Sequence, residues 1–275
     1  MSKIKIITDS TSYITREFAN ENNIAIVQLN YTFEGDTKLE GCPGEFNDFF
    51  ERLSKSNSFP TTSQPAVGDF LLEYERALMD HDEILVITLS SKLSGTFNSA
   101  LNARKMVDGE RVTVIDSLQA AGNLKFLVEE AVHMANNGAD IIDIVKAIEN
   151  QKKNMGIFLT IDNLEYLRKG GRLSSIQSFI GSALNIKPII ELKDGELKLV
   201  EKARGKKKAI NAILNKVPSQ IKKLSISHIL NDEGALELKD LFEAKYKNVF
   251  ITIDEIGPII GTHLGAGALG VCFEY

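Results

Sequence analysis

The sequence predicts an α/β protein of two domains: an N-terminal parallel sheet flanked by helices and a C-terminal α+β domain with a mixed sheet. Three observations predict this architecture. The chain has 275 residues, roughly twice the length of a common domain. Short apolar runs alternate with helical patterns in the first half. A hairpin signal, Asp194-Gly195, stands among helical patterns in the second half. We place the two domains at residues 1–153 and 154–275.

Composition restricts the class of protein. Hydrophobic residues make up 43% of the chain and charged residues 25%, which excludes a disordered or fibrous protein. The formal net charge of −5 argues against nucleic-acid binding. Cys42 and Cys272 lie in no metal-ligand or redox motif, so we expect no metal and a reduced, cytoplasmic protein. The N-terminal apolar run is too short for a signal peptide. The charge-free residues 256–273 contain five glycines, so we expect a buried loop and strand there, without stable membrane insertion.

The first half follows a strand–helix alternation. β-branched runs end abruptly in small polar residues, and apolar residues recur at helical spacing between them. This order is typical of a parallel sheet covered on both faces. We expect strands at residues 4–7, 24–29, 84–89 and 112–115, and helices that begin at Pro65, after Ser94-Gly95-Thr96, and over residues 124–136 and 140–153.

Asp9, Ser90 and Asp116 follow three of these strands. Ligands of open α/β sheets bind at the carboxyl ends of the strands, so this edge is a candidate site. Asp9 and Asp116 would serve a phosphoryl-transfer or hydrolytic enzyme with a divalent metal, which is one hypothesis. We favour a capping role for Asp9.

The second half mixes hairpin and helical patterns. A strand at 156–161 leads to a short helix and the basic turn at 168–172, and a charge-free helical pattern follows over 173–186. The remaining expected elements are a hairpin at 189–192 and 197–200, helices at 206–216 and 233–246, and strands at 224–229, 249–253 and 268–273.

Familiar catalytic motifs are absent or misleading. Gly265, Gly267 and Gly270 match the dinucleotide fingerprint, but that motif requires a following helix and only five residues remain. The sequence has no phosphate-binding P-loop and no Gly-x-Ser-x-Gly nucleophile elbow.

Two hydroxyl-rich stretches, residues 60–65 and 90–96, each precede an expected helix, and His263 lies in an expected glycine-rich loop. The hydroxyls are either helix caps or, together with the histidine, a shared anion site. A binder of an anionic metabolite, such as a phosphorylated one, is therefore a further hypothesis.

Several motifs in order resemble the DegV family. They are Thr62-Ser63-Gln64-Pro65, Ser91-Lys92-Leu93-Ser94-Gly95-Thr96, Leu167-Arg168-Lys169-Gly170-Gly171-Arg172, and Glu255-Ile256-Gly257-Pro258 through Gly270. The match runs from Thr8-Asp9-Ser10 to the C-terminus. The resemblance implies a two-domain carrier that binds one long-chain fatty acid as its ligand between the domains. Such a carrier presents the carboxylate of this ligand to a separate ATP-binding fatty-acid kinase subunit. The resemblance implies no activity of the chain alone and no cofactor.

The resemblance also implies roles for individual residues. The carboxylate ligands fall on Thr62 or Ser63, on Ser94 and on His263, with Gly95, Thr96 and Thr262 around them. Arg172 and Arg204 fall on the positions that face the kinase subunit. Ala66 and Ala266 depart from the family pattern, in which serine and proline are commoner, and both substitutions bear on the geometry around the carboxylate.

Two further sets stay open at this point. The basic run Lys202, Arg204, Lys206, Lys207 and Lys208 is either a solvated helix face or a surface that docks an acidic or ATP-bearing partner. Candidates for lining the acyl tail, each also a candidate for ordinary core, are Ile157, Leu159, Leu164, Phe179, Ile180 and Leu184.

Overall fold

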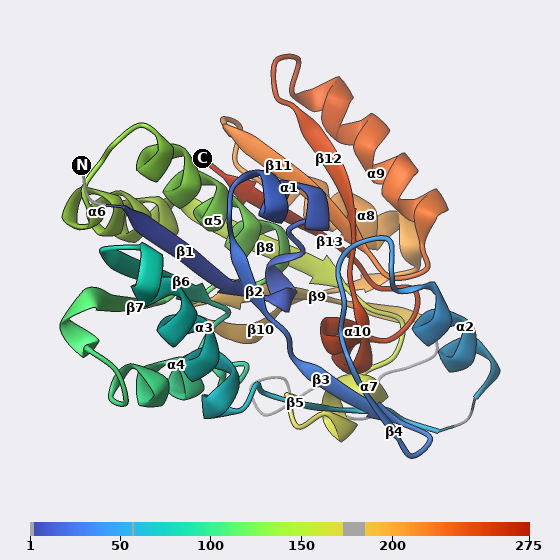
Figure 1. Cartoon of the computed structure of the whole chain (residues 1–275). Coiled ribbons are helices and arrows are strands. Elements are labelled where there is room, and N and C mark those ends of the chain that lie inside the picture. Colours follow the sequence, from blue (N-terminus) through green and yellow to red (C-terminus); the bar gives the residue numbers. More distant parts are fainter. Residues whose placement is uncertain (1–2, 57, 173–184) are drawn as a thin grey trace.

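The structure is a computed structural model that describes residues 3–56, 58–172 and 185–275. Its strands form three sheets: a parallel sheet of four strands, a mixed sheet of six and an antiparallel sheet of three (Figure 1). The first two confirm the predicted fold class. The helical pattern expected at 173–186 falls largely on residues 173–184, which lie outside the described residues.

The parallel sheet has the order β2-β1-β6-β7, and all its pairs are parallel. Helices α5, α6 and α1 cover one face and α3 and α4 the other, each over its own apolar core. Burial on both faces explains why β6 reads as an unbroken apolar run. The strands are β1 (Ile4–Asp9), β2 (Ala25–Val27), β6 (Glu83–Thr88) and β7 (Val112–Asp116); the helices are α1 (Arg16–Glu21), α3 (Val67–Asp80), α4 (Thr96–Arg104), α5 (Ala121–Asn136) and α6 (Ile141–Gln151).

The mixed sheet has the order β10-β9-β8-β13-β11-β12. Its β9–β10 hairpin turns at Asp194 and Gly195, whose φ angles of 54° and 81° are those that a tight hairpin turn requires. The expected hairpin is therefore confirmed. The elements are β8 (Met155–Thr160), α7 (Glu165–Lys169), β9 (Ile186–Lys193), β10 (Glu196–Arg204), α8 (Lys206–Lys216), β11 (Lys223–His228), α9 (Asp232–Lys245), β12 (Ile251–Glu255), α10 (Pro258–Leu264) and β13 (Leu269–Glu274).

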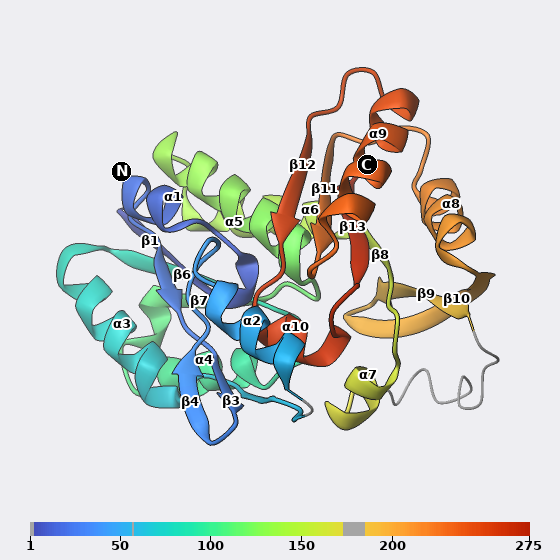
Figure 2. The same cartoon turned by 90° about the vertical axis from the view of Figure 1, so that its right-hand side faces the viewer.

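The two faces of the mixed sheet have different neighbours. Helices α8 and α9 pack together on one face, over an apolar core of their own (Figure 2). The N-terminus of α5 approaches the other face closely at Gly122, where an added Cβ would lie 2.9 Å from the Cβ of Cys272. Glycine at this position therefore lets a helix of the first sheet pack directly on the second sheet.

The third sheet, β4-β3-β5, was not expected from the sequence. Its strands are only three or four residues long, and β4 is exposed throughout, so no apolar alternation marks it. Helix α2 covers it with an aromatic cluster. The bounds are β3 (Asn30–Phe33), β4 (Asp36–Leu39), β5 (Thr61–Ser63) and α2 (Asn47–Lys55).

Two local expectations were wrong. Thr62 and Ser63 belong to β5, and α3 begins only at Val67, so they are not helix caps. His263 lies on the short helix α10 instead of a loop, because Pro258 begins this helix at its first position and Gly265, at φ 76°, ends it.

A buried carboxylate connects the first half of the chain to α10. Glu40 is 3% exposed, and its Oε1 accepts a hydrogen bond of 2.9 Å from the Ile259 backbone N–H in the first turn of α10. The Tyr13 hydroxyl donates to the same oxygen at 3.4 Å. Burial raises the pKa of Glu40 to about 8, and the hydrogen bonds offset this only in part. The two halves are thus joined by specific contacts, while the domain limits at 153 and 154 stay a prediction.

We expect Phe49→Ala to lower the free energy of unfolding by about 3–5 kcal/mol, because Phe49 is 2% exposed and packs its ring against Tyr31 at 4.8 Å. Phe250→Ala is the size-matched control: Phe250 is 83% exposed, so its loss should change stability by less than about 0.5 kcal/mol. Urea unfolding measures both. Equal losses would contradict the assigned core.

We expect Glu40→Gln to flatten the dependence of stability on pH. The carboxyl keeps its proton up to about pH 8 in the folded chain, whereas its ordinary pKa is 4.5, so folding of the wild type binds a proton between these values. Its stability therefore falls as pH rises through this window, by up to about 1.4 kcal/mol per pH unit.

Urea unfolding of both proteins at pH 6.5, 7.0, 7.5 and 8.0 measures this difference. The range lies above the pKa of Asp9, which burial raises only to about 6. Parallel curves for wild type and variant would show that Glu40 is ionised throughout.

Candidate ligand-binding site

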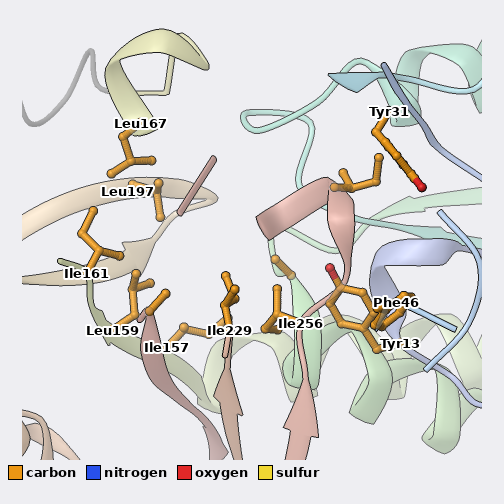
Figure 3. Packing of buried hydrophobic residues seen from close by; sticks show 14 of the residues in the cluster. Tyr13, Tyr31, Phe46, Ile157, Leu159, Ile161, Leu167, Leu197, Ile229 and Ile256 are labelled. Carbon is orange, nitrogen blue, oxygen red and sulfur yellow. The ribbon is translucent and has the colours of Figure 1, made fainter. Parts of the chain in front are cut away.

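A cavity of about 320 Å³ lies between the mixed sheet, α10 and the first half of the chain. Its wall is mostly apolar and comes from β8, the β9–β10 hairpin, β11, β13 and α10. In Figure 3, Leu159 and Leu197 extend from the sheet toward the region that Ile229 and Ile256 border. The volume is that of an ordinary small-molecule site. The aliphatic residues of the wall include Leu29, Leu89, Leu93, Ile157, Leu159, Leu167, Leu192, Leu197, Ile229, Ile256, Ile259, Ile260 and Leu264.

Polar side chains from three elements also line this cavity. β5 supplies Thr62 and Ser63, the loop before α4 supplies Ser94 and Gly95, and α10 supplies His263. The Oγ1 of Thr62 lies 2.9 Å from the Nε2 of His263, although 201 positions separate them in sequence. The structure thus brings together all four residues expected to bind a carboxylate.

Ser94 and its neighbours form a compact turn at the start of α4. The Oγ atoms of Ser94 and Thr96 are 2.9 Å apart, and the Thr96 backbone N–H donates to the Ser94 Oγ at 3.3 Å. Gly95 leaves room for the amide of Gln64, because an added Cβ would lie 1.7 Å from its Oε1 and the side chain of Gln64 would have to move. Thr96 does not line the cavity, so its contact with the site runs through Ser94.

His263 is neutral at neutral pH. Burial, together with a smaller effect of the positive charge of Arg172, lowers its pKa to about 4. A neutral imidazole has one N–H donor, so His263 would bind an anion by hydrogen bonding. Its Nδ1 is buried with no hydrogen-bond partner in the described part of the chain, as is the hydroxyl of Thr262. Gly170 gives the ring its space, because a Cβ there would lie 2.0 Å from Nδ1.

The two arginines differ in position. Arg172 lines the cavity, where its Nε and Nη2 donate to the Leu93 carbonyl at 3.1 and 2.9 Å. Burial lowers the pKa of this guanidinium. Arg204 is exposed at the end of β10 and does not line the cavity. Arg172 is therefore placed to act on a bound anion directly, and Arg204 only on a partner.

Asp9 and Asp116, the carboxylates of the alternative enzyme hypothesis, accept hydrogen bonds from backbone N–H groups. Asp9 is fully buried and accepts from the backbone N–H groups of Thr11 and Leu89 at 3.0 and 2.7 Å. Asp116 accepts from those of Ser91 and Leu118. These contacts agree with the capping role favoured for Asp9. No group of three or more His, Cys, Asp or Glu side chains suited to a metal occurs within residues 3–56, 58–172 and 185–275.

Some lining residues had no role assigned from the sequence. Gln64 donates from its Nε2 to the Ser99 Oγ at 3.0 Å and lies against Gly95. Ser227 and Cys272, which are 3.9 Å apart, add polar atoms to the wall. The sequence signal for Gln64 was its place in the motif Thr62-Ser63-Gln64-Pro65, next to two expected carboxylate ligands.

The residues that are candidates for lining the acyl tail differ in their positions relative to the cavity. Ile157 and Leu159 line the cavity. Leu164 packs against the same apolar cluster without lining the cavity. Phe179, Ile180 and Leu184 lie outside the described residues.

In the described part of the chain, no helix has the length and apolar character to cross a bilayer.

Comparison with known proteins gives consistent matches over the whole length. A model of uncharacterised proteins of the DegV family matches residues 3–275. Protein DegV of Bacillus subtilis is 37% identical over 276 residues, which cover 98% of each chain. The crystal structure of DegV from Bacillus subtilis, described as a fatty acid binding protein, matches with a TM-score of 0.89 at 35% identity and covers 100% of both chains. That of a DegV lipid binding protein from Thermotoga maritima matches with a TM-score of 0.89 at 35% identity, over 99% of this chain and 98% of that one. This chain therefore belongs to the DegV family.

Proposed function

We propose that this protein binds one long-chain fatty acid in the cavity and presents its carboxylate to an ATP-binding fatty-acid kinase subunit. The observation that carries the proposal is the 2.9 Å contact between Thr62 and His263 in the wall of a mostly apolar cavity. An amphiphile with one anionic end matches this distribution of polar and apolar wall. The fatty acid binding described for DegV of Bacillus subtilis supports the same ligand class.

The acyl tail supplies most of the affinity. About 15 buried methylenes at roughly 0.8 kcal/mol each give about 12 kcal/mol of gross hydrophobic free energy. Ordering the tail and losing free motion cost several kcal/mol of this. Each charge-assisted hydrogen bond at the carboxylate adds about 1.5–3 kcal/mol. The polar residues therefore fix the direction of the ligand more than its total affinity.

The carboxylate site has a defined chemistry in this proposal. Thr62, Ser63 and Ser94 donate hydroxyl hydrogen bonds, and neutral His263 donates a ring N–H. Arg172 contributes a nearby positive charge that compensates the buried carboxylate. Thr262, on the same helix, and Gly95 and Thr96, beside Ser94, hold these groups in place.

The kinase step requires a second protein. A carboxylate oxygen attacks the γ-phosphorus of ATP, the bond to ADP breaks, and an acyl phosphate forms. The chain carries no P-loop motif for holding ATP, which supports a carrier without activity of its own. We infer that Arg172 and Arg204 face the kinase subunit, as the family resemblance implies. Because the proposed kinase step needs ATP, we infer that the protein is cytoplasmic.

Native mass spectrometry of the purified full-length chain tests the ligand class. We expect a mass excess equal to one fatty acid, confirmed by extraction and identification of the molecule. A clean apo mass that persists after addition of long-chain fatty acids would overturn the proposal. Binding that does not depend on tail length would point instead to another anionic ligand.

We expect Ser94→Ala to weaken fatty-acid affinity by roughly 10- to 150-fold, because it removes one hydrogen bond to a charged carboxylate. Acyl phosphate formation with the kinase subunit should fall as well, while the unfolding midpoint changes little. Ser91→Ala is the matched control, since Ser91 belongs to the same loop and does not line the cavity. Unchanged affinity in Ser94→Ala would remove Ser94 from the carboxylate site.

We expect Arg204→Ala to leave fatty-acid affinity unchanged and to slow acyl phosphate formation several-fold, since an exposed charge at the rim of an interface acts mainly on the association rate. The defect should shrink as salt is raised. Lys198→Ala, on the same strand, is the control. Equal turnover by both variants would show that Arg204 makes no contact with the kinase subunit.

A further inference from the structure

A second cavity, of about 170 Å³, lies on the opposite face of the mixed sheet. Side chains alternate along β8, so Leu159 lines the fatty-acid cavity while Thr160 lines this one. The cross-strand neighbours of Thr160 are Ile189 and Leu269, which belong to the core under α8 and α9. The two cavities are therefore distinct sites separated by the sheet.

Thr160 presents an unused polar group to this second cavity. The residue is 8% exposed, and its Oγ1 is buried with no hydrogen-bond partner within the described residues. An unpaired buried hydroxyl costs about 1–3 kcal/mol. A ligand with hydrogen-bond acceptors would recover this free energy.

The N-terminus of α8 borders the same cavity through Lys206. The residue before it, Gly205, has φ 85° and no side chain to cap the helix, and no other described side chain does so. The backbone N–H groups of the first turn are consequently free of intrahelical partners, and the helix dipole favours an anion there. α9 begins nearby in a different way, because Asn231 caps it by accepting from the Gly234 N–H at 3.3 Å.

Charged side chains complete the cavity wall. Lys206 is 4.0 Å from Glu233, whose side chain is 96% exposed, so this ion pair is weak. Lys187 is only 19% exposed and pairs with Asp162 at 2.7 Å. Two ammonium groups and one carboxylate therefore line the cavity, with a surplus of positive charge from Lys206 and the helix end.

We propose that this cavity binds a phosphate group, either as inorganic phosphate or as a phosphomonoester. Thr160 and Lys206, the first residue of α8, border one cavity, and a tetrahedral dianion has enough acceptor oxygens for their side chains and for backbone N–H groups at the start of the helix. Asp162 opposes the anion and sets an upper limit on its affinity. The site explains part of the basic run at 202–208 that the fatty-acid site leaves unused.

Phosphate titration of the full-length, ¹⁵N-labelled protein tests the proposal, with chloride at matched ionic strength as the reference. Inorganic phosphate and glycerol phosphate are titrated separately. We expect saturable amide shifts confined to Thr160 and the first turn of α8. Tighter binding of glycerol phosphate would identify an ester as the natural ligand, and tighter binding of inorganic phosphate would identify the free anion.

Variants separate this site from general attraction to lysines. Thr160→Val and Lys206→Ala should each weaken binding by about fivefold or more, Thr160→Ser should retain it, and Asp162→Asn should tighten it. Lys208→Ala is the control, since Lys208 lies in the same helical turn and does not line the cavity. Retained fatty-acid binding confirms that each variant is folded. Non-saturable shifts, or equal effects of Lys206→Ala and Lys208→Ala, would overturn the proposal.

Discussion

The position of helix α10 is the constraint on which the proposed fatty-acid site depends. Its first turn donates the Ile259 N–H to the buried carboxyl group of Glu40, and its last turn places His263 against Thr62. Both partners belong to the first half of the chain, whereas the helix itself belongs to the second. Gly261 lets the helix approach the rings of Phe49 and Phe50 between these two contacts. A helix of seven residues has little stability of its own, so these tertiary contacts determine where the imidazole lies.

Burial at this junction also determines the protonation states of the groups involved. The same loss of hydration raises the pKa of Glu40 and lowers that of His263, so both groups favour the neutral form. Arg172 lines the same cavity, and among the described residues it forms no ion pair with a carboxylate. In the proposed function, the carboxylate of the ligand would supply this negative charge. Selectivity for an anion would then arise from the surroundings of the histidine and not from a charge on its ring.

The sequence predicted those features that local chemistry determines. The unbroken apolar run of β6 follows from burial on both faces, and Asp194-Gly195 accepts the positive φ angles of its turn. The candidate carboxylate ligands came from the family resemblance, and the structure places them together. The sheet β4-β3-β5 escaped prediction because its strands are only three or four residues long and β4 is exposed throughout, so the alternation of β3 alone is too short to indicate a sheet. The helix that carries His263 escaped because Gly261 and Thr262 favour a loop locally, while its stability comes from contacts such as that with Glu40, which is distant in sequence.

Strand β8 contributes aliphatic side chains to one cavity and a hydroxyl-bearing side chain to another. Ile157 and Leu159 give an aliphatic wall to the larger cavity, and Thr160 points to the opposite face, among residues packed under α8 and α9. Since the side-chain period of a strand is two, a slip of one residue in its register would exchange these faces. It would place the hydroxyl in the larger cavity and leucine beside the α8 N-terminus. The antiparallel pairing of β8 with both β9 and β13 fixes that register from two sides. The same pairing that shapes the larger cavity therefore also places Thr160 at the second cavity, on the far side of the sheet.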